Sequence, residues 1–489
     1  MSQQVQNEQK TLHLRQTESI KMVRSSYLNL PHRFYQSIRP ASFPDPQLVM
    51  FNSELAQELG LEFSSDAEIA KIFSGKELLP GSEPIAQAYA GAQFGHFVPL
   101  LGDGRAHIIG EINGLDIQLK GSGRTQFSRR GDGKSALGPV IREFLVSEAM
   151  HALGVPTTRA LCAVTTGERV MRMEGPEPGG IFTRVADSHV RVGTFQYFSN
   201  QEDLEALTLL TDYVIDRHYP DIQQKDLGER CLELLRRFAD RQGDLVAQWF
   251  GFGFIHGVMN TDNCSIAGIT IDYGPCAFLD EFKFSKVFSS IDRQGRYAYG
   301  NQMNITEWNI LRFAECLIPL INDNQETAIS LIKDALGNIL DNLPQRVYQQ
   351  FGQKLGLGEF EKGDEELVKE FWQYLEEHTL DFTKSFANLD ALLEGDTAYF
   401  PSHQKLTDFL EQWKSRSPNP SLISAKNPKL IPRNHQIQHA IDHGNEGNYE
   451  PMKILWDALK SPFKVADEHH RLTTPPEPNE RVYQTFCGT

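Results

Sequence analysis

The stretch HGVMNTDNCSIAGITIDYGP, residues 256–275, carries the most informative residues of this chain. Asp262 and Asn263 stand side by side, and Asp272 follows at the end of an apolar run. On turns flanked by buried strands, these side chains offer the oxygen ligands that Mg²⁺ or Mn²⁺ beside a nucleotide requires. A spare carboxylate can also take a proton from a hydroxyl group. The stretch predicts a metal-dependent nucleotide site; the alternative is that Asp262 caps a turn and Asn263 adopts a left-handed conformation.

Two glycine-rich segments upstream of this stretch carry positive charge. In LGDGRAH, residues 101–107, Gly102 and Gly104 allow close approach of a backbone to phosphates, and Arg105 can pair with them. KGSGRTQFSRRGDGK, residues 120–134, sets five cations against one acid, Asp132. Interleaved glycines and cations suit a loop that wraps a polyphosphate, because backbone N–H groups and guanidinium groups both donate hydrogen bonds. A plain turn and a solvated basic loop are the alternatives. The cations are Lys120, Arg124, Arg129, Arg130 and Lys134.

The order of charged residues resembles that of a protein kinase. Glu143 lies on a predicted helix after Lys120, and kinases orient a phosphate-binding lysine with such a glutamate. Asp-Tyr-Gly at residues 272–274 resembles the kinase Asp-Phe-Gly, but Asp262 and Asn263 are adjacent, where a kinase spaces its aspartate and asparagine five apart. The pattern favours a kinase-like layout with a rewritten catalytic loop. Glu143 could instead pair with its neighbour Arg142 or face solvent.

Hydrophobic periodicity predicts an α+β protein with two lobes and a protein-kinase-like plan. Asn113-Gly114 between two β-rich runs predicts a hairpin over 106–120. A helix follows at 138–153, then strands at 159–166 and 181–187. Arg184 and Arg191 flank the end of the second strand and can contact phosphates; the alternative is that each is a surface residue. Helices are expected at 52–60, 66–74, 204–214, 231–250, 304–321, 324–341, 365–383, 403–415 and 448–459, with a small hairpin at 265–272. The expected divisions are a disordered tail 1–28, a β-rich N-lobe 29–200, a helical C-lobe 201–400 and a helical C-terminal extension 401–489.

Composition narrows the class of protein. The chain has 489 residues and a formal net charge of -16, which disfavours non-specific nucleic-acid binding. It contains neither an apolar run long enough to span a membrane nor a secretory signal, so a cytoplasmic location and no membrane partner are expected. The six cysteines have no metal-binding spacing, which predicts free thiols in a reducing compartment. Cys487, in the polar tail, is the candidate for an exposed reactive thiol.

Several long motifs resemble the selenoprotein O family, also called YdiU-like, from about residue 29 to the C-terminus. They are AYAGAQFGHF, LGDGRA, LKGSGRTQFSRRGDGK, IREFLVSEAMHALGVPTTRAL, HGVMNTDN, IDYGP and GRYAYGNQ. The resemblance implies transfer of AMP from ATP to Ser, Thr or Tyr hydroxyls of proteins, with release of pyrophosphate. It also implies a kinase-like fold in which the nucleotide lies reversed, so that the α-phosphate meets the attacking hydroxyl.

The resemblance assigns roles to individual residues. Asp262 matches the proton acceptor, Asn263 and Asp272 match the ligands of Mg²⁺ or Mn²⁺, and Glu143 matches the partner of the lysine. In the reversed pose the β- and γ-phosphates leave, which gives the basic loop a purpose. The residues that match ATP contacts are Gly102, Gly104, Arg105, Lys120, Asp132, Gly133, Arg184, Arg191 and Asp272.

Two departures from the family and three alternative functions remain open. Ala92 stands where many members have histidine in YAGHQFG, and the tail reads TFCGT with an ordinary cysteine, Cys487. We expect little catalytic effect from Ala92, and a regulatory disulfide from Cys487 has no identified partner. The alternative functions are UMP transfer from UTP with Mn²⁺, a kinase that uses the γ-phosphate, and a catalytically silent scaffold that binds ATP. The sequence does not identify the target proteins.

Overall fold

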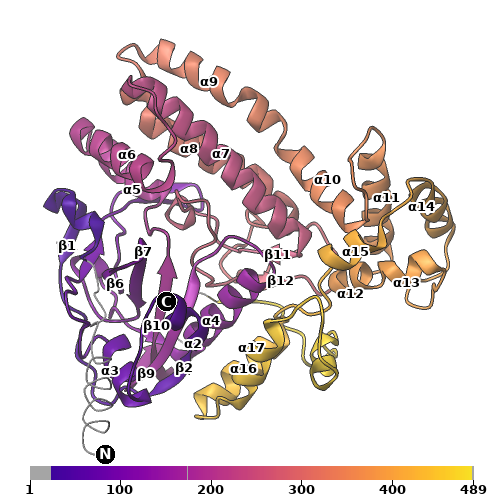
Figure 1. Cartoon of the computed structure of the whole chain (residues 1–489), viewed down its shortest axis with the longest axis horizontal. Helices are drawn as coiled ribbons and strands as arrows, with labels where there is room; N and C mark the ends of the chain where they lie inside the picture. The colour runs from indigo at the N-terminus through magenta and orange to yellow at the C-terminus, as the bar shows by residue number, and fades with distance from the viewer. Residues whose placement is uncertain (1–23, 173–174, 487–489) are drawn as a thin grey trace, which may run out of the picture.

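The computed structural model describes residues 24–172 and 175–486. Its first part is built on a sheet and the remainder is mostly helical (Figure 1), which agrees with the predicted α+β class. Most of the predicted tail 1–28, and Cys487, lie outside the described residues. At the end of that tail, however, the 3-10 helix η1 (Ser26–Asn29) buries Tyr27. The Tyr27 ring packs against Phe34, so the last residues of the predicted disordered tail are structured.

The main sheet contains eight strands. Seven follow the order β1-β3-β6-β7-β10-β9-β2, β8 pairs with β10 beside this path, and β4–β5 and β11–β12 form separate two-stranded sheets. All pairings in the main sheet are antiparallel. The strands are β1 (Tyr35–Ser37), β2 (Leu48–Phe51), β3 (Ile85–Gln87), β4 (Gly91–Gln93), β5 (His96–Val98), β6 (Ala106–Ile112), β7 (Leu115–Lys120), β8 (Ser135–Ala136), β9 (Arg159–Arg172), β10 (Gly175–Ala186), β11 (Phe254–Ile255) and β12 (Ala277–Phe278).

The hairpin predicted over 106–120 is confirmed as β6 and β7. Its turn residues Asn113 and Gly114 have φ values of 53° and 80°, a backbone region that asparagine and glycine adopt more easily than other residues. The turn fixes the register so that Lys120 ends β7 opposite Ala106. The next strand, β10, places Arg184 opposite Gln118. The sheet thus holds Lys120 and Arg184 on neighbouring strands.

Helix α4 (Leu137–Ala152) confirms the helix predicted at 138–153. It packs against β9 and β10 on one side and against α16 (Asn434–Asn445) on another, and most of its residues are buried (Figure 1). A helix covered on two sides needs apolar residues around most of its circumference, which explains why this segment is rich in apolar residues. The packing also buries Glu143, whose exposed fraction is 4%.

Most of the remaining described elements are helices. The other helices that overlap predicted ones are α2 (Ser53–Glu58), α3 (Asp66–Phe73), α6 (Leu204–His218), α7 (Leu227–Gly251), α8 (Gln302–Ile321), α9 (Gln325–Asp341), α14 (Gln404–Ser415) and α17 (Glu450–Leu459). Besides α16, the helices that we did not predict are α5 (Val192–Ser199), α10 (Leu343–Lys354), α13 (Leu389–Glu394) and α15 (Pro420–Lys426). Three of these four have no more than eight residues, too few for a clear periodic signal.

The single helix predicted at 365–383 is wrong. The structure has α11 (Asp364–Glu377) and α12 (Phe382–Ala387), separated by a turn in which Thr379 has a positive φ of 53°. Asp381 caps the second helix by accepting a hydrogen bond from the backbone N–H of Lys384. A left-handed residue followed by an aspartate cap ends one helix and starts another.

The small hairpin predicted at 265–272 is also wrong. The chain turns at Gly268, but its two arms form bridges with other segments: Ser265 with Arg191, and Thr270 with Thr157. Trp249 also donates a hydrogen bond to the Thr270 hydroxyl group. These partners satisfy polar groups that would otherwise pair across the turn, and this segment becomes a connection between the sheet and the helices.

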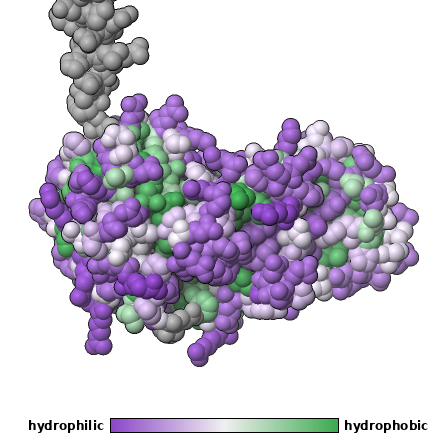
Figure 2. Space-filling view, turned by 90° about the horizontal axis from the view of Figure 1, so that it is seen from below, coloured by the Kyte–Doolittle hydropathy of each residue, from purple (hydrophilic) through white to green (hydrophobic). Residues whose placement is uncertain are grey.

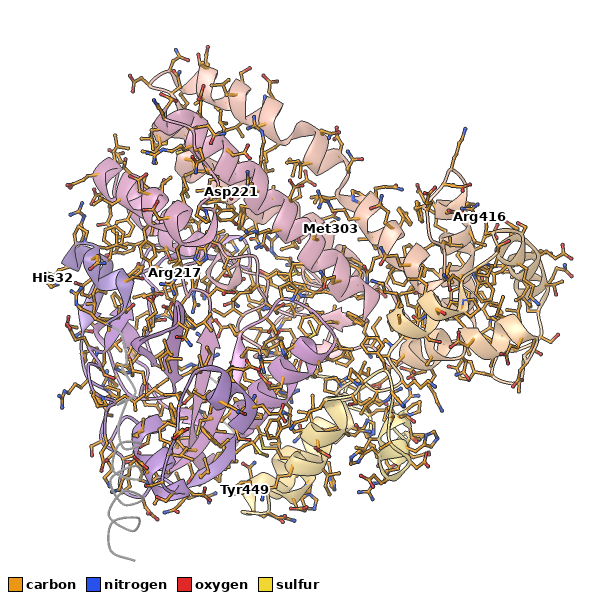
Figure 3. All side chains as sticks on the ribbon, in the orientation of Figure 1. His32, Arg217, Asp221, Met303, Arg416 and Tyr449 are labelled. Carbon is orange, nitrogen blue, oxygen red and sulfur yellow. The ribbon has the colours of Figure 1, made fainter. Side chains whose placement is uncertain are left out.

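Buried ion pairs join the parts of the chain. Arg217 of α6, labelled in Figure 3, contacts Glu111 at 2.8 Å and Asp116 at 2.9 Å, and so ties α6 to the β6–β7 hairpin. Arg433, at the start of α16, contacts Asp381 at 2.8 Å and Asp280 at 3.2 Å. Removing one partner from such a buried pair leaves an uncompensated charge, so these contacts fix the position of the attached segments.

The face seen in Figure 2 is largely hydrophilic, with apolar residues in small patches. Among the described residues, none of the helices combines the length and the apolar character that crossing a membrane requires. Cys162, Cys231, Cys264 and Cys316 are buried free thiols.

Lys354 provides a test of the packing of the helical part. Its ammonium group lies 4.5 Å from the ring of Phe386 and 5.7 Å from the rings of Phe252 and Phe382, and burial lowers its pKa from 10.5 to about 7. Between these values the unfolded chain binds more protons than the folded chain, so the free energy of unfolding increases with pH.

We predict that the free energy of unfolding rises less steeply with pH in Lys354→Met than in the wild-type protein. From about pH 7.5 to about pH 9, the wild-type protein should gain roughly 2 kcal/mol relative to the variant. Urea unfolding at both pH values measures the difference. If the free energy of unfolding changed with pH to the same extent in both proteins, Lys354 would be charged in the folded protein, which would contradict the prediction.

Candidate active site

A cleft of about 950 Å³ collects the residues that the sequence singled out. Of the predicted site residues, Glu143 alone is not among the residues that line it; Glu143 lies behind Lys120. The cleft joins loops of the sheet with the segment around 256–275. The predicted residues in its wall are Gly102, Gly104, Arg105, Lys120, Asp132, Gly133, Arg184, Arg191, Asp262, Asn263 and Asp272.

Lys120 joins the sheet, α4 and the 272–274 turn. Its Nζ lies 2.5 Å from Oε1 of Glu143 and 2.5 Å from Oδ1 of Asp272. The side chain is 8% exposed, so these are buried ion pairs. The structure therefore places Glu143 against Lys120, and not in solvent.

Asp272 lies at the centre of a cluster of cations. Besides Lys120, Arg184 contacts its carboxylate at 2.9 Å and Arg191 at 3.1 Å. Burial alone would raise the pKa of Asp272, but the three cations outweigh burial and hold the pKa well below 3.8. Asp272 also has a positive φ of 67°, an uncommon backbone conformation that the surrounding contacts maintain. Asp272 is therefore charged at neutral pH and holds the three cations together.

Arg191 connects the two loops that carry the acids. Its Nη1 donates to the backbone oxygen of Asp262 at 2.9 Å, as well as to the carboxylate of Asp272. The guanidinium group stacks on the ring of Tyr89 at 4.5 Å, and Asp103 lies 3.9 Å away. Because α5 begins directly after Arg191, the helix fixes the position of this side chain.

Asp262 has a different environment from Asp272. Burial raises its pKa to about 6, although the charge of Arg191 opposes the shift. Its Oδ1 is buried without a hydrogen-bond partner, and its Oδ2 accepts a hydrogen bond from Nε2 of Gln93 at 3.4 Å. A carboxylate with a pKa just below neutrality is mostly charged at pH 7 and still basic enough to take a proton.

Asn263 follows Asp262 in the 3-10 helix η4 (Thr261–Asn263). Its amide nitrogen donates to the backbone oxygen of Val258 at 2.9 Å, which leaves the amide oxygen as the group available for a ligand. Among residues 24–172 and 175–486, no group of three or more His, Cys, Asp or Glu side chains is arranged to hold a metal ion. A divalent ion at Asn263 and Asp272 would need further oxygen ligands from a phosphate or water.

The glycine-rich segments pack against each other. A Cβ atom at Gly102 would lie 2.3 Å from the ring of Phe127, and one at Gly104 would lie 2.9 Å from the Phe127 carbonyl oxygen. Gly133 has a φ of 71°, and a Cβ atom there would lie 2.4 Å from the backbone nitrogen of Arg124. These glycines are needed for the shape of the cleft wall, whether or not a phosphate touches them. Asp132, which is 45% exposed, pairs with Arg172 at 2.9 Å.

Sequence reasoning missed several residues in the cleft wall. Tyr89, Asp103 and Arg172 were not proposed. Tyr89 lies in the motif AYAGAQFGHF and Asp103 in LGDGRA, but neither position had a role assigned, and an arginine in a strand carries no distinctive local pattern. Gln93 and Phe94 belong to the motif AYAGAQFGHF, which supported the family resemblance but had no role assigned.

Comparisons with known proteins agree with this resemblance. A family model described as "Protein adenylyltransferase SelO" matches residues 20–460. Proteins named "Protein nucleotidyltransferase YdiU" from Agrobacterium fabrum and Rhizobium rhizogenes are each 48% identical to this chain over 485 and 490 residues, covering 95% of it and 99% and 96% of their own lengths. One from Geobacillus kaustophilus is 44% identical over 485 residues, covering 95% and 98%.

These matches define the protein class as an enzyme that transfers nucleotidyl groups, and a nucleotide is therefore one of its substrates. The chain belongs to the SelO family, as its motifs predicted.

The role of Gly133 can be tested by nucleotide binding. Gly133→Ala combines a positive φ with a clash against backbone, and strain of about 1–3 kcal/mol should distort the loop and weaken binding of a fluorescent ATP analogue roughly ten-fold or more. Gly337→Ala in α9 is the control, because its φ is not in the left-handed region and its Cβ atom would meet nothing within 4 Å. Equal affinities of Gly133→Ala and wild type would contradict this prediction.

Proposed function

We propose that this chain transfers AMP from ATP to Ser, Thr or Tyr hydroxyl groups of proteins and releases pyrophosphate. The observation that carries the proposal is the contrast between the two acids of the cleft. Asp272 is paired with three cations and has a depressed pKa, whereas burial raises the pKa of Asp262 to about 6. Two carboxylates whose environments separate their pKa values mark an acid–base assignment. Asp262 is then the proton acceptor.

The proposed reaction is an in-line displacement at the α-phosphorus. The oxygen of the acceptor hydroxyl forms a bond to phosphorus, its proton passes to Asp262, and the bond from phosphorus to the β-phosphate oxygen breaks. The two outer phosphates leave together as pyrophosphate. Lys120, Arg184 and Arg191 offset the negative charge of this leaving group, with Arg105 in the wall of the same cleft.

We propose that Asn263 and Asp272 hold the Mg²⁺ or Mn²⁺ ion that the family implies. Their donor set, an amide oxygen and a carboxylate, suits a hard cation that keeps phosphate oxygens and water among its ligands. When bound, such an ion supplies positive charge beside the phosphates. The residues of the chain orient the nucleotide and receive the proton.

The same contacts support a protein-kinase-like arrangement of two lobes. Lys120 at a strand end, Glu143 on the following helix and Asp272 before Tyr273-Gly274 have the order of the kinase lysine, glutamate and Asp-Phe-Gly aspartate. The adjacent Asp262 and Asn263 remain the departure from that pattern.

The position of the transferred label tests the proposed reaction. We expect proteins of a cell lysate to gain label from ATP labelled at the α-phosphorus and not from ATP labelled at the γ-phosphorus. Label from the γ-position would identify a kinase, preferential label from UTP with Mn²⁺ would identify UMP transfer, and no label from any donor would favour a silent scaffold.

Substitutions test the two acids. Asp262→Asn keeps the shape of the side chain and removes the base, so transfer should fall about 100-fold or more. Asp272→Ala leaves three cations without their central carboxylate and should abolish transfer. Asp221→Asn, at an exposed position between α6 and α7 (Figure 3), is the control. Near-normal transfer by Asp272→Ala would end the proposed assignment.

A further inference from the structure

The β4–β5 hairpin stands apart from the main sheet and contacts the turn that carries Asp262. Three successive hairpin residues donate hydrogen bonds to three successive residues of that turn. In this way the motif AYAGAQFGHF, which had no assigned role, contacts residues 260–262 of the motif HGVMNTDN. The bonds run from Ala92 N to Thr261 Oγ1 at 2.7 Å, from Gln93 Nε2 to Asp262 Oδ2 at 3.4 Å, and from Phe94 N to Asn260 Oδ1 at 3.0 Å.

The hairpin meets both oxygens of the Asp262 carboxylate. Oδ2 accepts the hydrogen bond from Gln93, and Oδ1 lies against the backbone of Gly91, where a Cβ atom would be only 2.3 Å away. Gly91 has no positive φ, so space and not backbone conformation requires glycine here. Contacts on both oxygens restrict rotation of the carboxylate group.

The turn is also held from its other side. Thr261 donates its hydroxyl hydrogen to Oε1 of Gln196 on α5 at 2.5 Å, and the hydroxyl group of Tyr297 donates to Oδ1 of Asn260 at 2.5 Å. Tyr297 belongs to the motif GRYAYGNQ, which also lacked a role. The side chains of Asn260 and Thr261 therefore form hydrogen bonds both with the hairpin and with the helical part of the chain.

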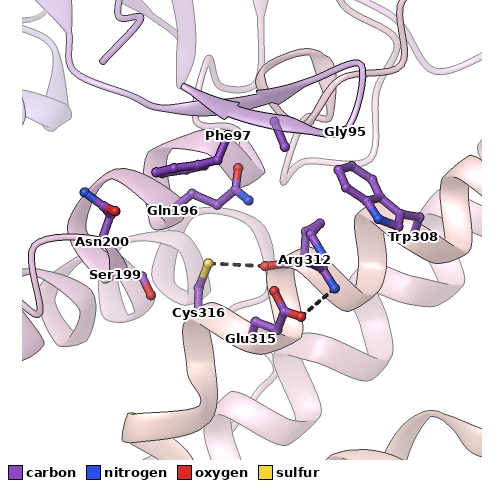
Figure 4. Close-up of a pocket in the computed structure, with 10 residues that line it drawn as sticks. Gly95, Phe97, Gln196, Ser199, Asn200, Trp308, Arg312, Glu315 and Cys316 are labelled. Atoms are coloured by element: carbon purple, nitrogen blue, oxygen red, sulfur yellow. Dashed lines mark hydrogen bonds and ion pairs between the residues drawn. The ribbon is translucent and has the colours of Figure 1, made fainter. Parts of the chain in front are cut away.

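The face of the hairpin that points away from Asp262 is incompletely packed. A pocket of about 260 Å³ lies there, with Gly95 and Phe97 on one side and Trp308 and Arg312 of α8 on the other (Figure 4). Phe97 is 43% exposed. Because packing is incomplete on this face, the hydrogen bonds to residues 260–262 contribute to holding the hairpin in place.

We infer that the β4–β5 hairpin positions the Asp262 carboxylate for nucleotidyl transfer, with Gln93 and Gly91 as the positioning residues. The inference rests on the proposed function, in which Asp262 accepts the proton. Gln93 acts by donating its amide hydrogen, and Gly91 acts by leaving room for the carboxylate.

Kinetics of substituted proteins test this role. Gln93→Met keeps the length of the side chain and loses the amide donor. We expect kcat for the transfer to fall roughly ten-fold, as for loss of a hydrogen bond to a charged group, while the KM for ATP stays within about two-fold of wild type. Gln93→Glu puts a second carboxylate beside Asp262, and the repulsion between like charges should lower kcat further. Gly91→Ala should lose more, because its methyl group displaces the carboxylate.

The matched control is His96→Ala, since His96 is exposed and lies opposite Gln93 in the hairpin. It should leave both kinetic constants unchanged. A side chain that only fills space would be replaced by methionine without loss, so normal kcat in Gln93→Met would overturn the inference while leaving the proposed function intact.

Hydrogen exchange measures the contact independently of transfer. In the full chain, the amides of Ala92 and Phe94 should be protected, and Thr261→Val, which removes the acceptor of Ala92 N–H, should speed exchange of the Ala92 amide about ten-fold or more. Unprotected hairpin amides in the wild-type protein would overturn the inference by themselves. A wild-type protein that has protected amides but transfers label from no donor would overturn the catalytic role together with the proposed function.

Discussion

The carboxylate of Asp272 brings together three cations from different parts of the chain. Lys120 ends β7, Arg184 comes from β10 and Arg191 precedes α5. Three buried positive charges would repel one another without an anion between them, and burying an unpaired charge costs several kcal/mol. The position of the sheet relative to the 272–274 turn therefore depends on this one charge. Glu143 adds a second carboxylate at Lys120 and extends the dependence to α4.

The cluster also explains how an acidic protein provides a site for phosphates. The formal net charge is -16, but the cleft gathers Lys120, Arg184 and Arg191 around the carboxylate of Asp272, and further lysines and arginines line its wall. Eight Lys or Arg residues and four Asp residues line the cleft, so an excess of four formal positive charges remains there. Buried guanidinium groups held by carboxylates keep their orientation before a ligand arrives, and such preorganised charges are the effective ones in catalysis.

Local sequence signals predicted the parts of the structure that local physics determines. Asn113-Gly114 predicted a hairpin, and the apolar sequence of residues 138–153 predicted a buried helix. The segment 265–272 was predicted wrongly because its partners, Arg191 and Thr157, lie far away in the sequence. The same limit applies to the site: the spacing of Lys120 and Glu143 suggested a pair, whereas no local pattern could indicate that Gln93 contacts Asp262.

Asp262 and Asp272 show how one side chain type acquires two different properties within one loop. Arg191 touches both residues, but it reaches the carboxylate of Asp272 and only the backbone oxygen of Asp262. A direct ion pair would have depressed the pKa of Asp262 and weakened it as a base. Arg191 binds the backbone of Asp262 and so fixes the loop without pairing with the carboxylate. Burial is then the dominant influence on that carboxylate, and it raises the pKa of Asp262. The orientation of that carboxylate must then come from uncharged groups, and the structure offers Gln93 and the bare backbone of Gly91.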